Sequence, residues 1–302
     1  MLTSTSIQNL FYLIVGIAFL LLSKVKSALS GYRTPKPFGT AEWMRSANYD
    51  ITVVDEWLRH LSTYAPTRSV ANKNVLELGP GSDIGTGLYL LSKQTSQYVG
   101  VDVNNLVSKA PNELYEALFS LISLRNASSI DSLRSELKWS QEGKSQRLRF
   151  VHRPEFDLSS CITAGSVDLI FSQAAFEHFD DFNRFATDLT AVAKPGAILI
   201  AEVDLQTHSR WIRDKDELNI YRYSDRIYNL LRCPGSPNRL RPFQYKSALQ
   251  NEGWTDIRIL PLTVLDNQRL SSVRGYLAKR FRDDENRMEQ LSIVLCATRG
   301  AT

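Results

Sequence analysis

A turn with two glycines follows the short apolar run Val75–Leu78 and is the first indication of chemistry in the sequence. Gly79 and Gly81 let the backbone turn sharply and approach a ligand that a side chain would exclude, and the acid Glu77 stands just before them. A dinucleotide-binding turn would carry a further glycine at position 84, where this chain has Ile84. The turn therefore predicts a nucleotide cofactor at the carboxyl end of a strand and disfavours a pyrophosphate.

A second acid stands near the end of the next apolar run, Tyr98–Val103. In α/β nucleotide-binding folds, the acid at the tip of the second strand holds the ribose. A carboxylate accepts hydrogen bonds from two hydroxyls at once, which suits a ribose diol. Asp102 is therefore predicted to bind the ribose of the cofactor.

Short apolar runs bounded by turn residues alternate with longer segments along the chain, and this pattern predicts buried parallel strands joined by helices. Two late runs would close the sheet as a reversed hairpin. The predicted fold is α/β, with a doubly wound, mostly parallel seven-stranded sheet. Its strands are expected at Val75–Leu78, Tyr98–Val103, Leu148–His152, Val167–Ser172, Ala197–Val203, Asp256–Val264 and Leu291–Thr298.

Four further motifs follow the first two strands in order. Phe156-Asp157-Leu158 comes after the third strand, and Ser172-Gln173 stands at the carboxyl end of the fourth. Glu177-His178 follows, and Lys194-Pro195-Gly196 precedes the fifth strand. Taken with the glycine turn, this series resembles the class I S-adenosylmethionine-dependent methyltransferases of the small-molecule or glycan type, and the resemblance covers about residues 74–204.

The resemblance implies a Rossmann-like methyltransferase fold that binds S-adenosylmethionine. Asp157 would meet the adenine amino group, and Ser172 and Gln173 would face the methyl donor. The full set of cofactor-binding residues implied is Glu77, Gly79, Gly81, Asp102, Asp157, Ser172 and Gln173.

Two histidines are candidates for catalysis. His178 is beside the expected cofactor cleft and His208 follows the fifth strand, and a near-neutral pKa suits an imidazole to deprotonate a hydroxyl, although a structural role is open for both. Some quinone-biosynthesis methyltransferases bind a metal through an acid three residues before the Glu of Glu-His, where this chain has Ala174. No metal is therefore expected.

The first 23 residues carry no charge, and the apolar run Leu10–Leu22 is followed at once by Lys24 and Lys26. Residues 1–26 are predicted to form a hydrophobic helix that anchors the chain as a single span. A signal peptide and an interfacial or buried helix are the alternatives. The basic residues after the helix, which include Arg33 and Lys36, place the catalytic domain in the cytoplasm.

Residues 27–73 are expected to form a connector with prolines at 35, 37 and 66 and a helix at Ile51–Leu61. The catalytic domain would fill 74–302, with an extra helix or lid within 104–147 and a substrate-capping insertion at about 205–255. Inside this insertion, three arginines among prolines indicate an exposed loop, either solvated or gripping an anion: Arg232, Arg239 and Arg241.

A net charge of +4, from 36 basic and 32 acidic residues, is too weak to predict nucleic-acid binding. The three cysteines are widely spaced and indicate reduced thiols rather than a metal site. The expected function is methyl transfer to an unidentified acceptor, with a glycan, lipid-linked or small-molecule hydroxyl favoured. The alternatives are a nucleotide-dependent oxidoreductase and a catalytically silent binding module.

Overall fold

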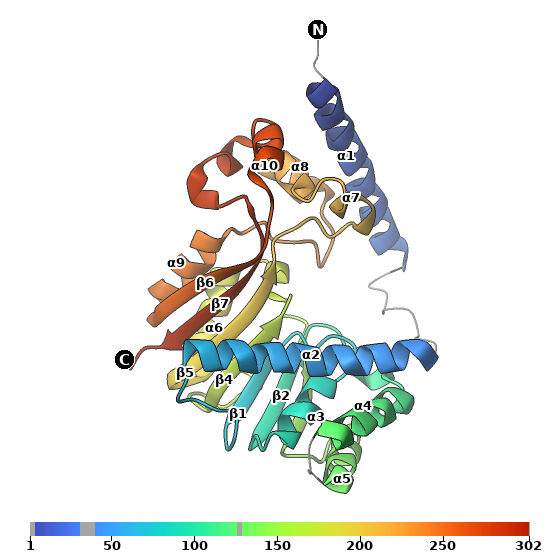
Figure 1. Ribbon diagram of the computed structural model, residues 1–302, viewed down its shortest axis with the longest axis vertical. Coiled ribbons are helices and arrows are strands. Elements are labelled where there is room, and N and C mark those ends of the chain that lie inside the picture. The colour runs from blue at the N-terminus through green and yellow to red at the C-terminus, as the bar shows by residue number, and fades with distance from the viewer. Residues whose placement is uncertain (1–3, 31–39, 126–128, 302) are drawn as a thin grey trace.

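The computed structural model describes residues 4–30, 40–125 and 129–301. Arg33, Lys36 and the prolines at 35 and 37 lie outside the described residues. Within them, the predicted seven-stranded sheet is confirmed, with strand order β3-β2-β1-β4-β5-β7-β6 (Figure 1). The paired strands among β1 to β5 are parallel, and β7 is antiparallel to both of its neighbours, β5 and β6. The strands are β1 Asn74–Leu78, β2 Gln97–Asp102, β3 Leu148–His152, β4 Val167–Gln173, β5 Ala193–Asp204, β6 Trp254–Val264 and β7 Gln290–Arg299.

Helices cover both faces of the sheet, because successive side chains of a strand point to opposite faces. One face packs against α2 (Thr40–Tyr64), α3 (Gly85–Ser92), α4 (Asn112–Arg125) and α5 (Ile130–Gln141). The other packs against α6 (Phe182–Val192) and α9 (Pro242–Asn251). Trp57 of α2 stacks on Phe171 of β4 at 5.0 Å, so the helix predicted at 51–61 is the inner part of a longer helix.

A smaller unit, which we call the cap, stands at the carboxyl ends of the strands and consists of residues 205–241 and 265–289. It contains α7 (Arg210–Arg213), α8 (Asp225–Leu231) and α10 (Asn267–Arg274) around a core that includes Tyr221 and Phe281. The cap differs from the insertion expected at 205–255, because α9 buries Tyr245 and Leu249 against the sheet and a second segment completes the cap.

The prediction of an exposed arginine loop is wrong for two of its three members. Arg239 and Arg241 are 2% and 0% exposed. The Arg241 guanidinium donates to the backbone carbonyls of Asn286, Arg287 and Gln290 at 2.7–2.9 Å, and so joins the two segments of the cap. Arg232 pairs with Asp180 at 2.6 Å. The turn residues of this stretch predicted an exposed loop. An irregular backbone, however, leaves carbonyl groups that no helix or strand satisfies, and the buried guanidinium groups donate hydrogen bonds to them.

The N-terminal helix α1 (Ser4–Ser30) lies along the cap (Figure 1). Asn219 donates to the carbonyl of Tyr12 at 2.9 Å, and Phe19 stacks on Trp211 with ring centroids 5.1 Å apart. Its segment Ser6–Leu29 has a mean hydropathy of 1.9 over its most apolar window, only 11% of which is buried. The helix is long and apolar enough to cross a membrane, as a signal sequence also is.

Candidate active site

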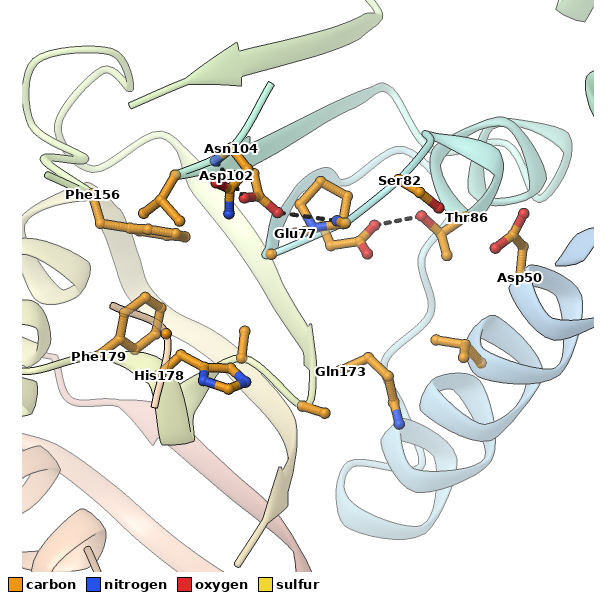
Figure 2. Close-up of a pocket in the computed structure, with 18 of the residues that line it drawn as sticks. Asp50, Glu77, Ser82, Thr86, Asp102, Asn104, Phe156, Gln173, His178 and Phe179 are labelled. Carbon is orange, nitrogen blue, oxygen red and sulfur yellow. Dashed lines mark hydrogen bonds between the residues drawn. The ribbon is translucent and has the colours of Figure 1, made fainter. Parts of the chain in front are cut away.

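A cavity of about 370 Å³ opens at the carboxyl ends of β1, β2 and β4 (Figure 2). Strand order reverses at β1, and ligands of open α/β sheets bind at such a switch point. The wall includes five of the predicted residues: Glu77, Gly79, Gly81, Asp102 and Gln173, together with His178.

The two glycines of the turn after β1 have left-handed backbone conformations, with φ of +74° and +78°. A Cβ at Gly79 would lie 2.7 Å from the Cβ of Ala175, so only glycine permits this close approach. A Cβ at Gly81 would meet no atom within 4 Å, because the backbone there faces the cavity. The turn thus leaves open the space that a ligand needs.

Glu77 is buried at the tip of β1 and is held by two hydroxyls. Tyr98 donates to its carboxylate at 2.6 Å, and Thr86 donates to the same oxygen. Burial raises the pKa of Glu77 to about 7, although both hydrogen bonds oppose the shift. The carboxyl group is therefore fixed in place and poised to respond to a nearby positive charge.

Asp102 ends β2 with both carboxylate oxygens held by backbone amides. The amide of Gly81 donates to one oxygen at 3.0 Å and that of Asn104 donates to the other at 2.8 Å. Burial raises the pKa of this group, and the two amides oppose the rise. Each oxygen keeps a lone pair for a further donor, so the side chain suits two neighbouring hydroxyls.

An aromatic wall stands where Asp157 was expected to bind adenine. The Phe156 and Phe179 rings line the cavity edge to face, with centroids 4.6 Å apart (Figure 2). Asp157 is not among the lining residues, and its carboxylate accepts from the Ser159 hydroxyl at 2.8 Å. The expected contact of Asp157 with adenine is therefore corrected, because the backbone at Phe156, with φ of +54°, turns the ring inward.

Ser172 and Gln173 point in opposite directions at the end of β4, as successive strand residues do. The Ser172 hydroxyl is fully buried and donates to the carbonyl of Leu78 at 3.1 Å, which joins β4 to β1. The expectation that Ser172 faces the methyl donor is corrected accordingly. Gln173 lines the cavity on the side of α2 (Figure 2).

The structure brings both predicted histidines together, although 29 residues separate them in the chain. Their rings pack edge to face with centroids 5.0 Å apart, and of the two only His178 lines the cavity at the strand ends. Glu177, a residue that the sequence did not single out, is 1% exposed, and neither carboxylate oxygen has a hydrogen-bond partner among the described residues. Its Oε1 lies 3.7 Å from Nε2 of His208.

These three side chains are positioned by both the sheet and the cap. Asn238 of the cap donates to the carbonyls of Phe176 and Phe179 at 2.9 and 3.0 Å, which fixes the turn that carries Glu177 and His178. Nδ1 of His208 lies 3.1 Å from the carbonyl oxygen of Gln206. The three donor atoms fall within 4.8 Å of one another, a spacing that suits a metal ion. The absence of a metal, inferred from position 174, stays a prediction.

Local environment separates the pKa values of the two histidines. Burial lowers the pKa of His178, outweighing the nearby Glu177 carboxylate. Burial also disfavours the charged form of His208, but the Glu177 carboxylate overcomes it, so that the pKa of His208 is raised. The imidazole of His178 consequently favours its neutral form, whereas that of His208 holds its proton more tightly.

Residues 46–259 match a family model described as a methyltransferase domain. The chain belongs to this methyltransferase family. It is a class I S-adenosylmethionine-dependent enzyme, as the motif series implied, and the oxidoreductase and silent-module alternatives lose their support. A search of curated proteins finds no significant match.

Solved structures share the fold of the methyltransferase at low sequence identity. The CurJ carbon methyltransferase is 18% identical, with a TM-score of 0.41 over 77% of this chain and 50% of that one. A phosphoethanolamine N-methyltransferase from Haemonchus contortus, solved with S-adenosyl-L-methionine, is 13% identical, with a TM-score of 0.46 over 84% and 52%. The chain thus spans about half the length of these two neighbours. A Mesorhizobium loti methyltransferase is 12% identical, with a TM-score of 0.44 over 80% and 96%.

The far end of the methyltransferase cavity holds an acidic pair that the sequence did not indicate. Asp50 of α2 lines the cavity, is 5% exposed and faces the Asp83 carboxylate, and its Oδ2 accepts no hydrogen bond from the described residues. Burial, and then Asp83, raises the pKa of Asp50 well above its ordinary value. Asp50 and Glu77 thus give this end of the cavity two carboxyl groups, the group type that an ammonium ion requires. The helical periodicity of α2 predicted only packing, and so Asp50 was missed.

Proposed function

We propose that this methyltransferase methylates a hydroxyl group of a glycan, a lipid-linked compound or a small molecule, with His178 as the base. The observation that carries this proposal is a neutral imidazole in the wall of the cofactor cavity. When bound, S-adenosylmethionine supplies a methyl group already activated by its sulfonium. The protein then needs chiefly to orient the acceptor and remove a proton.

The cofactor would be held by residues of the sheet edge and α2. We assign the ribose to Asp102, the adenine to the Phe156–Phe179 wall and the ammonium group to the acidic end with Asp50 and Glu77. The turn with Gly79 and Gly81 leaves room for the cofactor, and Gln173 would lie beside the methyl group that is transferred. Ser172 and Asp157 support this site indirectly, through the β1–β4 junction and the loop after β3.

In the proposed transfer, a C–O bond forms to the acceptor as the C–S bond breaks, and the hydroxyl proton passes to His178. The positive charge that His178 gains is stabilised by the buried Glu177 carboxylate. His208 lies beside the same carboxylate, and its ring packs against that of His178. His208 would thus act as a positioning residue.

The test is incubation of the purified enzyme with S-adenosylmethionine labelled in its methyl group and with lipid and aqueous fractions of its source cells. We expect label in one fraction only, as an ether that resists mild alkali. Label that alkali removes as an ester, or label in amines, would reject a hydroxyl acceptor.

We also propose that α1 attaches the enzyme to the cytoplasmic face of a membrane. Its outward side carries a continuous apolar stripe, whose members are all at least 46% exposed: Ile7, Leu10, Phe11, Ile14, Leu21, Leu22 and Val25. Lys24 and Lys26 follow, and the basic flank favours the cytoplasm. Since the other side packs on the cap, a helix embedded lengthwise is favoured over the single-pass span expected from length alone.

Full-length protein should therefore pellet with membranes and stay there in 1 M salt, a condition that removes proteins held by charge alone. A chain that begins at Tyr32 should be soluble and still bind S-adenosylhomocysteine. Recovery of full-length protein in the soluble fraction without detergent would contradict the proposed membrane attachment. A mature chain cleaved near Ser23 would indicate export.

A further inference from the structure

A second cavity, of about 210 Å³, lies between α1 and the cap. Gly16, Phe19 and Leu20 of α1 form one wall, and Ile212, Tyr228 and Cys233 belong to the opposite wall. The wall on α1 is apolar apart from Ser23. A water-soluble sugar would find few hydrogen-bonding groups on that side.

This cavity adjoins the cofactor cavity at His178 and His208. Gly235 lines both cavities. His208 lines the second, and its ring packs against His178, which lines the first. The two cavities consequently meet at Gly235 and the histidine pair.

The α1 wall is a close-packed contact. A Cβ at Gly16 would lie 2.0 Å from the Tyr223 hydroxyl and 2.1 Å from Oδ1 of Asn219, so a side chain there would push the helix away. Tyr223 donates to the carbonyl of Leu13 at 3.2 Å, beside the Asn219 bond to Tyr12. Glycine therefore allows α1 to close the cavity.

We propose that the second cavity holds the apolar chain of an amphiphilic acceptor, a long-chain alcohol or hydroxylated lipid, with its hydroxyl at His178. This inference rests on the proposed function and narrows the acceptor class. The apolar chain of the acceptor would lie between α1 and the cap. Since we propose that α1 lies in the membrane, the acceptor would reach the enzyme directly from the bilayer. The bond changes are those already given: the alcohol oxygen gains the methyl, the C–S bond breaks and the proton goes to His178.

Cys233 offers a native probe of this cavity, and Cys161, which is half-buried and does not line it, is an internal control. Full-length enzyme in phosphatidylcholine vesicles is treated with N-ethylmaleimide, with or without n-dodecanol, and both thiols are followed by peptide mass spectrometry. We expect dodecanol to slow labelling of Cys233 at least fivefold and to leave Cys161 unchanged. Glucose should protect neither thiol.

Gly16→Val tests the α1 wall, with Gly275→Val as its matched control because an added Cβ at Gly275 meets no atom within 4 Å. In Gly16→Val, Cys233 should label quickly with or without dodecanol, whereas Gly275→Val should behave as the parent. Equal protection in Gly16→Val and the parent would overturn the role of α1.

Calorimetry with S-adenosylhomocysteine separates the two proposals. If the parent binds it but dodecanol gives no protection, or if glucose protects Cys233, the amphiphile site is wrong and the proposed function stands. If dodecanol protects but S-adenosylhomocysteine does not bind, the proposed function fails.

Discussion

The two sides of the active site are built in different ways. On the cofactor side, the Glu77 carboxylate at the tip of β1 is held by the hydroxyls of Tyr98 and Thr86. Asp102, at the end of the adjacent strand β2, is held by the backbone amides of Gly81 and Asn104. On the acceptor side, Glu177 follows β4, whereas His208 and Gly235 belong to the cap, so these residues meet only when the cap packs on the sheet. We therefore expect the ends of neighbouring strands to determine cofactor binding, and the packing of the cap on the sheet to determine the choice of acceptor.

The largest effect should come from Gly81→Val on the cofactor side. The new side chain occupies ligand space, so binding of S-adenosylhomocysteine by calorimetry should be lost while the protein stays folded. Gly143→Val is the matched control, since Gly143 also has positive φ, +69°, with no atom near an added Cβ, but lies outside the cavity. If both variants bind like the parent, the cofactor lies elsewhere.

His178→Asn comes next and tests the acceptor side alone. Losing a general base lowers turnover by about 10²–10⁴-fold, and cofactor affinity should be unchanged. Because burial holds the pKa of His178 below 6.5, the parent should keep full activity at pH 7 and lose it only as acid protonates the imidazole. That acid limb should vanish in the variant. An unchanged pH profile in His178→Asn would remove the histidine from catalysis.

Asp102→Ala should have a smaller effect and only on the cofactor side. Losing a charged acceptor costs about 1–3 kcal/mol, which weakens cofactor affinity by roughly 5–150-fold. Turnover at saturating cofactor should change little. Loss of the folded state, seen by circular dichroism, would mean that the bonds to the amides of Gly81 and Asn104 serve structure first.

This contrast explains what the sequence could predict. The seven strands and the glycine turn follow from short-range patterns of apolar and turn residues, and these were confirmed. The inward turn of Phe156 and the burial of Arg241 depend on contacts with distant segments, which no pattern of residues along the sequence could predict. For the same reason, the sequence identified both histidines and the Glu177-His178 motif, but not that Glu177 is buried beside both imidazoles.

Glu177→Gln should give the smallest effect, and it distinguishes proton transfer from metal chemistry at the histidine pair. The carboxylate raises the pKa of His178 more than the neighbouring His208 lowers it, so its loss should move the acid limb of the activity profile to lower pH. Turnover should fall by only about tenfold, since His178 itself remains. A merely structural role for Glu177 would reduce activity without moving the acid limb.

Treatment of the parent enzyme with EDTA should leave its rate unchanged. A loss of activity that added Zn²⁺ restores would instead make Glu177, His178 and His208 a metal centre, because their donor atoms already lie within 4.8 Å of one another.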